Sequence, residues 1–259
     1  MSDGRYFSGV DLKRVEEASL NGLQTQRQLF YDGWLLRLSP GKAKRARSVN
    51  AHFGSSLPLP QKIAYCEKAY AQRGLPTLFR ITPFIAPPDL EDALAARGYE
   101  AFETTLVQLR SLASLPVTTI VPDVELEVPS AARFVEAVGE LQGVTKEQRA
   151  AHLERLAHTP LSTRSMLAVV DGRPVGTGSI AVEDGLAGVY SLATAADMRG
   201  RGIGSWILGA LLTWAWEHAV GHAYLQVDAD NHRAISLYRK FGFEDAYTYH
   251  YRGRPGECH

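Results

Sequence analysis

Residues 199–204, which read RGRGIG, place three glycines and two arginines directly before a long apolar stretch. Another apolar run, residues 186–194, ends shortly before them, so the glycines stand between a predicted strand and a predicted helix. Glycines let successive backbone N–H groups converge on an anion, while a helix N-terminus and the arginines add positive charge. This segment therefore indicates a phosphate-binding loop, with an ordinary structural turn as the alternative.

Two common phosphate-binding motifs do not fit this loop. A Walker loop needs Lys and then Ser or Thr after its last glycine, whereas Ser205 and Trp206 follow Gly204. The dinucleotide fingerprint needs the order G-x-G-x-x-G, whereas the order here is G-R-G-I-G. The loop must therefore be interpreted together with other segments of the chain.

A second segment, NHRAISLYRKFGF, occupies residues 231–243 and begins twenty-seven residues after the last glycine of the loop. Arg199-x-x-Gly202-x-Gly204 resembles the acetyl-CoA pyrophosphate motif of the GNAT acyltransferases, Arg/Gln-x-x-Gly-x-Gly/Ala. Asn231, Ala234 and LYRKFGF resemble the second signature of that family. The resemblance covers about residues 125–252, and two motifs at this separation make it specific.

The resemblance implies how acetyl-CoA would be held. The loop would bind the pyrophosphate through its backbone N–H groups, and the strand before it would pair with the pantetheine arm. The N–H of Ala193 would face the thioester carbonyl as an oxyanion donor, a role worth ~3–4 kcal/mol in other acyl-transfer sites. Asn231 would bond the pantetheine. The implied coenzyme-binding residues are Leu192, Ala193, Thr194, Arg199, Gly200, Arg201, Gly202, Ile203, Gly204, Ser205, Asn231 and Ala234.

The resemblance also implies that Tyr238 approaches the coenzyme sulfur as the catalytic residue. When a neutral amine attacks the thioester, thiolate leaves, and a phenol of pKa ~10 beside a thiol of pKa ~8.5 would assist mainly by a hydrogen bond. The alternative is an aromatic that only packs on a helix face. A base must keep the amine neutral; Glu183, Asp228 and Tyr190 are candidates, none is assigned, and His222 complements a helix end.

The elements that position these residues follow an alternating order from Val124 onward. The pattern predicts β-α-α-β-β-β-α-β-α-β, with a hairpin at Asp171-Gly172 and a helix from Ser205 to Val220. A hairpin meander joined to one strand-helix-strand crossover predicts a sheet of mixed direction. The fold class is therefore α+β (mixed α/β), and the resemblance implies the GNAT acyl-CoA acyltransferase fold for this half.

The first half of the chain reads as a weak internal repeat of the second. DALAARGYEAF aligns with SLYRKFGFEDA, which places Gly98 on Gly242 and Leu94 on Tyr238. FGSSLPLP stands in place of the Arg/Gly loop and has no arginine. Chance similarity of two helix ends is the alternative. We predict a degenerate GNAT-like domain at residues 1–115, a linker at 116–123 and a GNAT domain at 124–259.

A basic cluster lies on the predicted hairpin of the first half. Its members are Arg37, Lys42, Lys44, Arg45 and Arg47. We interpret it as a solvated loop face, with a site for an anion or an acidic substrate as the alternative.

Composition excludes several functional classes. Lys+Arg and Asp+Glu both count 28, so no net charge favours nucleic acid or an anionic membrane. Cys66 and Cys258 are too far apart for a zinc motif or a disulfide framework. No apolar run reaches the ~20 residues that span a bilayer, and residues 1–10 lack a signal-peptide core. We expect a cytoplasmic protein without metal, nucleic-acid or membrane partners, and leave the oligomeric state open.

The resemblance favours an N-acetyltransferase that moves an acetyl group from acetyl-CoA to a primary amine. We expect that amine to belong to a small molecule. A non-catalytic acyl-CoA sensor and a protein N-terminal or lysine acetyltransferase are the alternatives. The intact loop together with Tyr238 favours the enzyme.

Overall fold

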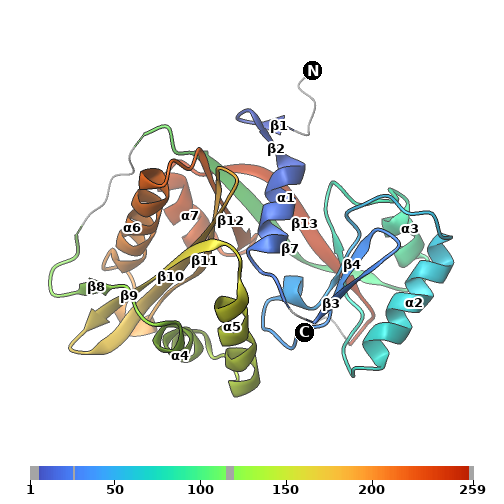
Figure 1. Ribbon diagram of the computed structural model, residues 1–259, viewed down its shortest axis with the longest axis horizontal. Coiled ribbons are helices and arrows are strands. Elements are labelled where there is room, and N and C mark those ends of the chain that lie inside the picture. Colours follow the sequence, from blue (N-terminus) through green and yellow to red (C-terminus); the bar gives the residue numbers. More distant parts are fainter. Residues whose placement is uncertain (1–5, 26, 115–119, 257–259) are drawn as a thin grey trace. The chain divides into compact units, whose positions relative to one another are not determined.

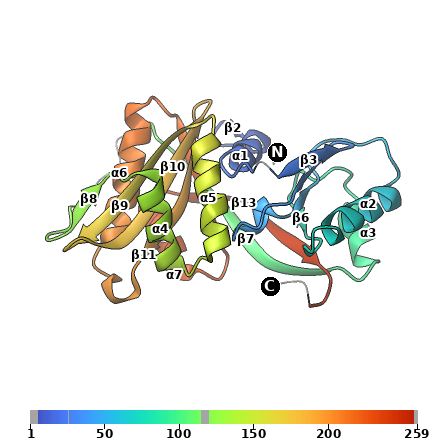
Figure 2. The same cartoon turned by 60° about the horizontal axis from the view of Figure 1, so that its bottom comes forward.

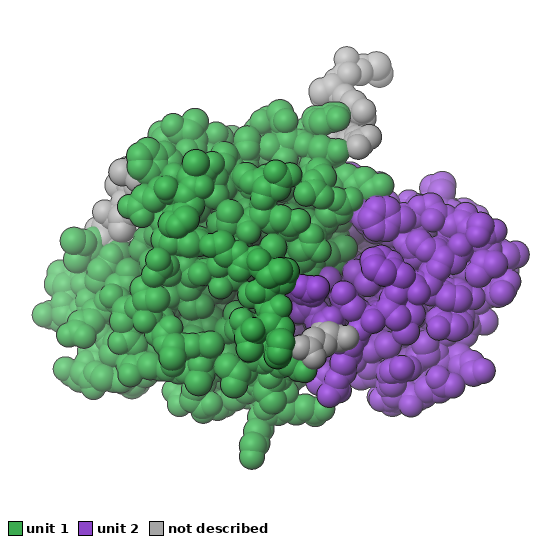
Figure 3. Space-filling view, viewed as in Figure 1, with its two compact units in different colours: residues 1–22, 107–246 green, residues 23–106, 247–259 purple. Residues whose placement is uncertain are grey.

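Residues 6–25, 27–114 and 120–256 are described by a computed structural model. The chain forms two compact units, coloured green and purple in Figure 3. Unit 1 comprises residues 1–22 and 107–246, and unit 2 comprises residues 23–106 and 247–259. The units divide the chain at other residues than the boundary we expected near 116–123, and the separate domains 1–115 and 124–259 stay a prediction.

Unit 1 contains all but the last of the elements predicted from Val124 onward, in the predicted order, and the last predicted strand lies mostly in unit 2. Figure 1 labels them. They are β8 (Glu125–Glu127), α4 (Ala131–Gln142), α5 (Lys146–His158), β9 (Ser162–Val170), β10 (Arg173–Glu183), β11 (Leu186–Thr194), a 3-10 turn (Ala196–Met198), α6 (Ile203–Glu217), β12 (His222–Asp228) and α7 (His232–Lys240). The hairpin β1 (Tyr6–Phe7) and β2 (Val10–Asp11) and the helix α1 (Leu12–Asn21), which the sequence analysis did not predict, also belong to this unit.

The sheet of unit 1 has the order β7-β12-β11-β10-β9-β8, with β7 at Glu100–Ser111. β9, β10 and β11 pair antiparallel, and β11 pairs with β12 in parallel. Helix α6 lies close on one face, where a Cβ on Gly178 would come within 2.5 Å of Ile207. On the opposite face Leu167 and Val169 pack with Phe134 of α4 in a buried cluster. Figure 2 shows α4 in front of these strands.

Unit 2 repeats this topology on a smaller scale. Its elements are β3 (Gln28–Tyr31), β4 (Trp34–Arg37), a 3-10 turn (Lys44–Ala46), β5 (Val49–Asn50), α2 (Leu59–Ala71), β6 (Phe79–Ile81), α3 (Leu90–Ala95) and β13 (Glu244–Gly253). β3, β4 and β5 form an antiparallel meander, and β5 pairs with β6 in parallel across the helix α2. The order of the sheet is β3-β4-β5-β6-β13.

The aligned helix ends of the two halves have the same geometry. Gly98 follows α3 with φ +79° and Gly242 follows α7 with φ +78°, the left-handed conformation that favours glycine. The next residue donates its N–H to the carbonyl of Leu94 at 3.1 Å in one half and to that of Tyr238 at 3.1 Å in the other. This agreement, together with the shared topology, is what an internal repeat requires.

Two expectations about side chains need a correction or a limit. Arg37 of the basic cluster is only 1% exposed, so the interpretation of that cluster as a solvated loop face is wrong for this residue. The strand β4 carries it into the interior, whereas Lys42 on the following turn is exposed.

Cys66 is a buried free thiol, and Cys258 lies outside the described residues. No helix in the described ranges is long and apolar enough to cross a membrane.

Candidate functional site

The end of β11, the glycine loop and helix α7 meet at the start of α6. A Cβ placed on Gly204, in the first turn of this helix, would lie 3.5 Å from the hydroxyl oxygen of Thr194 at the end of β11. The same point lies 3.5 Å from Leu237, one residue before Tyr238 on α7. The fold therefore brings the end of β11, the glycine loop and α7 together.

The glycine loop leaves backbone donors available at the start of α6. Gly200 and Gly202 have φ +83° and +82°, which side-chain-bearing residues rarely adopt. The first intrahelical bond runs from Trp206 N to the Gly202 carbonyl at 2.9 Å, and no side chain of the described residues caps this end. The N–H groups of residues 203–205 precede that bond, so they point out of the helix toward a potential anion.

The helix begins at Ile203, two residues before the predicted Ser205, because a glycine is tolerated in a first helical turn. Arg199 and Arg201 are exposed beside this end. Asp197, the acid nearest in sequence, pairs with Arg173 at 2.6 Å. The hydrogen bond from Arg173 and the charge of Arg201 hold the pKa of Asp197 below its usual range. The loop as a whole is therefore accessible and positively charged.

Strand β11 has a free edge next to this loop. Its parallel pairing with β12 runs from Leu186 opposite His222 to Val189 opposite Leu225 and goes no further. The pairing with β10 shifts register between Thr177 and Ser179, and Ser191 has φ +53°, as in a β-bulge. Residues 192–194 thus offer backbone groups that an extended ligand can pair with in the manner of an added strand.

Helix α7 contributes an amide and a phenol. Asn231 caps the helix, since its Oδ1 accepts the N–H of Ala234 at 3.1 Å, and this leaves its Nδ2 as a donor. Tyr238 is 8% exposed and packs edge-on against Phe243, with ring centroids 6.1 Å apart. None of the residues described hydrogen-bonds its hydroxyl. Burial raises the pKa of Tyr238 to about 12.

The candidate bases lie at different places. Glu183 accepts two hydrogen bonds from Asn21 Nδ2, at 2.9 and 3.0 Å, and pairs with Leu186 at the start of β11. Ala193 is about 23 Å further along the strand at the usual ~3.3 Å per residue, so Glu183 cannot serve an acyl group there. The Tyr190 hydroxyl lies 2.9 Å from that of Tyr224, just where the pairing of β11 with β12 ends.

Asp228 ends β12 and accepts the N–H of Asp230 at 2.9 Å, which is a local turn bond. Its exposed carboxylate precedes the cap of α7 by three residues. Tyr190 and Asp228 therefore remain the candidates nearest to the free edge of β11, and no base is assigned.

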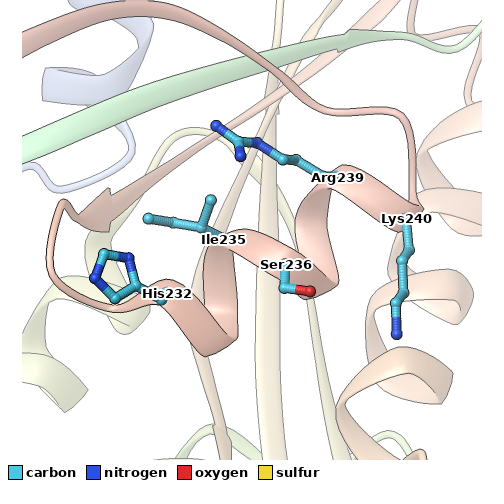
Figure 4. A pocket seen from close by; sticks show the side chains of 5 residues that line it. All are labelled: His232, Ile235, Ser236, Arg239 and Lys240. Atoms are coloured by element: carbon cyan, nitrogen blue, oxygen red, sulfur yellow. The ribbon is translucent and has the colours of Figure 1, made fainter.

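The sequence analysis did not single out a shallow groove along α7. Figure 4 shows its lining side chains on one face of the helix: His232, Ile235, Ser236, Arg239 and Lys240. Arg239 is held by Asp245 at 3.0 Å, and Asp245 also accepts from Gln108 at 2.6 Å. The spacing of three and four residues between polar side chains was the available signal. Nowhere in the described ranges do three or more His, Cys, Asp or Glu side chains form a group that could hold a metal ion.

Comparison with known proteins connects this geometry to a family. The model of the "Acetyltransferase (GNAT) family" matches residues 134–243. The uncharacterized N-acetyltransferase YobR of Bacillus subtilis (strain 168) is 27% identical over 247 residues, which cover 93% of this chain and 98% of YobR. A relative with partial coverage is the mycothiol acetyltransferase of Clavibacter sepedonicus, 37% identical over 95 residues, or 36% of this chain and 31% of that protein.

A solved structure shares the fold over nearly the full chain. The GCN5-related N-acetyltransferase from Kribbella flavida superposes with a TM-score of 0.71 at 22% identity, covering 94% of this chain and 95% of that one. A similarity at this identity shows the fold, which is the one that the glycine loop and the residues 231–243 had indicated.

Proposed function

We propose, from the match of residues 134–243 to the model of the GNAT acetyltransferase family, that this protein acetylates a primary amine of a small molecule with acetyl-CoA. The observation that carries the proposal is the convergence of the uncapped start of α6, the free edge of β11 and Tyr238. These are the parts that anion binding, chain alignment and assistance to a leaving group require. The rest of the site serves to hold them in register.

The residues of unit 1 fit the coenzyme that the family uses. Acetyl-CoA supplies an acetyl group activated as a thioester. Its pyrophosphate would accept from the N–H groups of residues 203–205, with Arg199 and Arg201 adding charge. Gly204 leaves room for this approach, because even a Cβ there would meet its neighbours only at 3.5 Å.

The free edge of β11 would align the pantetheine arm beside residues 192–194. In that alignment the N–H of Ala193 donates toward the carbonyl oxygen of the acetyl group, where negative charge develops. Asn231 keeps its Oδ1 on the helix cap, so its Nδ2 donates to an amide oxygen of the arm.

Tyr238 would donate a hydrogen bond to the departing sulfur rather than give up its proton. With the Tyr238 pKa raised to about 12 and a thiol pKa of ~8.5, complete transfer would be uphill by about 5 kcal/mol. A buried hydroxyl without a protein partner is nevertheless well suited to stabilise a thiolate, because hydrogen bonds to charged groups are the strong ones.

The test is release of free CoA thiol from acetyl-CoA by the full chain in the presence of amine panels. We expect turnover with a small-molecule amine and little with peptides that carry lysine or a free N-terminus. Coenzyme binding without turnover on any amine would identify a sensor and overturn the proposal. Preference for peptides would overturn the small-molecule acceptor alone.

A further inference from the structure

One face of the unit 2 sheet is buried and yet polar. The strand alternation sends Trp34, Leu36, Val49 and Phe79 into the apolar core with α2. On the opposite face, the register places Ser48 next to Arg37, Asn50 opposite Arg80, and Arg80 opposite Tyr251. No acidic residue stands at these register positions of unit 2.

The side chains of this polar face are held in place. Arg37 and Arg80 are each 1% exposed, which is rare for arginine. Arg37 Nη1 donates to the Leu23 carbonyl at 3.2 Å, and the Arg80 guanidinium stacks on the Tyr249 ring at 3.7 Å. Both arginines have further interactions. They supply positive charge around the face, while other atoms supply the open hydrogen-bonding positions.

Those open positions are concentrated here. Four buried atoms of unit 2 that have no hydrogen-bond partner are Gln28 Oε1, Arg45 Nη1, Ser48 Oγ and Asn50 Oδ1. Asn50 Nδ2 donates to the Ser48 carbonyl at 3.0 Å, which orients the amide so that Oδ1 is an open acceptor. Gln28 stands opposite Arg37 on β3 and so shares this face. Buried polar atoms that lack partners are rare, so a group of them calls for a ligand or ordered water.

Arg45 lies in the 3-10 turn Lys44–Ala46, which stands between β4 and β5 in the chain. Burial raises the pKa of Tyr251, and the charges of Arg80, which stands opposite it on β6, and of Arg45 act on this hydroxyl in the opposite direction. The face thus combines an open cationic donor, an open hydroxyl and two open amide acceptors. A simple anion would satisfy only the first two of these.

We propose that this face of unit 2 binds a small carboxylic acid that also carries an amine or hydroxyl group on the neighbouring carbon. Its carboxylate accepts from Arg45 Nη1 and from the Ser48 hydroxyl, and its amine or hydroxyl donates to Asn50 Oδ1 and Gln28 Oε1. This site is separate from the glycine loop, and its existence does not depend on the proposed acetyl transfer.

The first test is calorimetric titration of the full chain with small ligands. We expect saturable binding of glycine, L-alanine, glycolate or L-lactate. Acetate, which lacks the donor, and ethanolamine, which lacks the acid, should bind at least about tenfold more weakly, since each leaves a buried polar partner unsatisfied. Absence of saturable binding by all four acids at tens of millimolar, as expected of a face filled by water alone, overturns the proposal. Equal binding of acetate also overturns it.

The second test uses a matched pair of variants on the same segment. Arg45→Gln removes the open donor and should weaken binding of the best acid at least about tenfold. Lys42→Gln removes one positive charge from an exposed neighbouring position and should leave binding unchanged. Equal affinities of the two variants would contradict the assignment of Arg45. Unaltered melting of both variants, checked by circular dichroism, excludes a folding defect, and the ligand series on the unmodified chain remains decisive if either fails to fold.

Discussion

The loop before α2 and the loop before α6 hold the same place in their two halves, each between a meander strand and the helix that leads to a parallel neighbour. In unit 2 a side chain of the same unit accepts the hydrogen bonds of the loop. The carboxylate of Asp32 accepts the N–H of Ser56 at 3.0 Å, the N–H of Leu57 at 2.9 Å and the Ser56 hydroxyl at 2.8 Å. Lys62, which is buried, adds its ammonium at 3.2 Å.

In the part of unit 1 that the structure describes, no side chain caps the start of α6, and the loop carries two exposed arginines. The comparison teaches that, in one topology, a loop can leave its backbone N–H groups available, as we propose for coenzyme binding at α6, or can satisfy them with a carboxylate of the same unit, as Asp32 does. In unit 2 the carboxylate of Asp32 accepts these hydrogen bonds, and we expect it to contribute to stability. This supports our proposal that the first half is a degenerate copy that binds no coenzyme.

The largest effect is expected from Gly202→Glu, which places a carboxylate at the uncapped loop before α6. The position requires φ +82°, and the new charge would stand where the pyrophosphate binds. Like charges at close range cost several kcal/mol, so we expect CoA affinity to fall at least about 100-fold. Titration calorimetry and the shift in melting temperature with CoA measure it.

Gly185→Glu is the matched control, because Gly185 also has a positive φ of +74°, has nothing within 4 Å of a Cβ placed on it, and lies at the opposite end of β11 from the loop, so this variant should bind CoA almost normally. The unmodified chain should bind one equivalent of CoA. Two equivalents would show that the loop before α2 also binds coenzyme, and would contradict the difference between the loops.

The next effect concerns the last helix of each half, where Tyr238 in α7 corresponds to the buried Leu94 in α3. Tyr238→Phe keeps the ring and removes the hydroxyl, so kcat should fall about 100-fold, at the lower end of acid–base contributions. The KM for acetyl-CoA should move much less, since the hydrogen bond strengthens as the thiolate forms.

Because burial raises the pKa of Tyr238 to about 12, its ionisation should produce no loss of activity between pH 7 and 10. A tyrosine-dependent fall within that range, absent in the Phe variant, would contradict the buried phenol. Unchanged kcat in the variant would show that Tyr238 only packs against its neighbours.

Asp32→Asn tests the loop before α2, whose N–H groups Asp32 accepts, and should lower stability without affecting acetyl transfer. Hydrogen bonds from Leu57 and Ser56 lower the pKa of Asp32, so its stabilisation is present above the unfolded pKa of ~3.9 and is lost as pH falls through the folded pKa. We expect the variant to melt about 5 °C lower at pH 7. The gap between the two proteins should narrow below about pH 4, and a gap independent of pH would contradict the role of the charge.

The smallest effect is expected from Arg199→Gln in the loop before α6. Its side chain is exposed, and exposed ion pairs contribute only ~0.2–1 kcal/mol, so CoA affinity should fall about two- to fivefold. The loss should shrink at high salt, since exposed charges are screened. A loss that does not depend on salt would show that Arg199 acts through a buried contact instead.

Much of the fold followed from local signals. The hairpin at Asp171-Gly172, the helix ends at Gly98 and Gly242 and the period of the apolar residues produced the observed element order from Val124 onward. Helix α1 was missed although its signals were present, since Asp11 caps it through the N–H of Lys13 at 2.9 Å and Val15 is fully buried.

The candidate site was predictable where it depends on motif spacing, as in the glycine loop and the interval from Asn231 to Tyr238. The distance of Glu183 from Ala193 was not, because it depends on the register of β10 with β11. The hydrogen bonds between Asp32 and the loop before α2 could not be predicted either, since twenty-four residues separate Asp32 from Ser56.

The sequence by itself determined the helices, strands and turns from Val124 onward and the spacing of the motifs, because these depend on residues within a few positions of one another. Only the tertiary structure decided which strand completes each sheet: β13 from the end of the chain pairs with β6 in unit 2, and β7 lies beside β12 in unit 1. All strands offer the same backbone groups, so distant pairing is selected by packing and not by a local code. That pairing sets Tyr251 opposite Arg80, and the placement of β4 within the sheet buries Arg37, a residue whose type alone favours solvent.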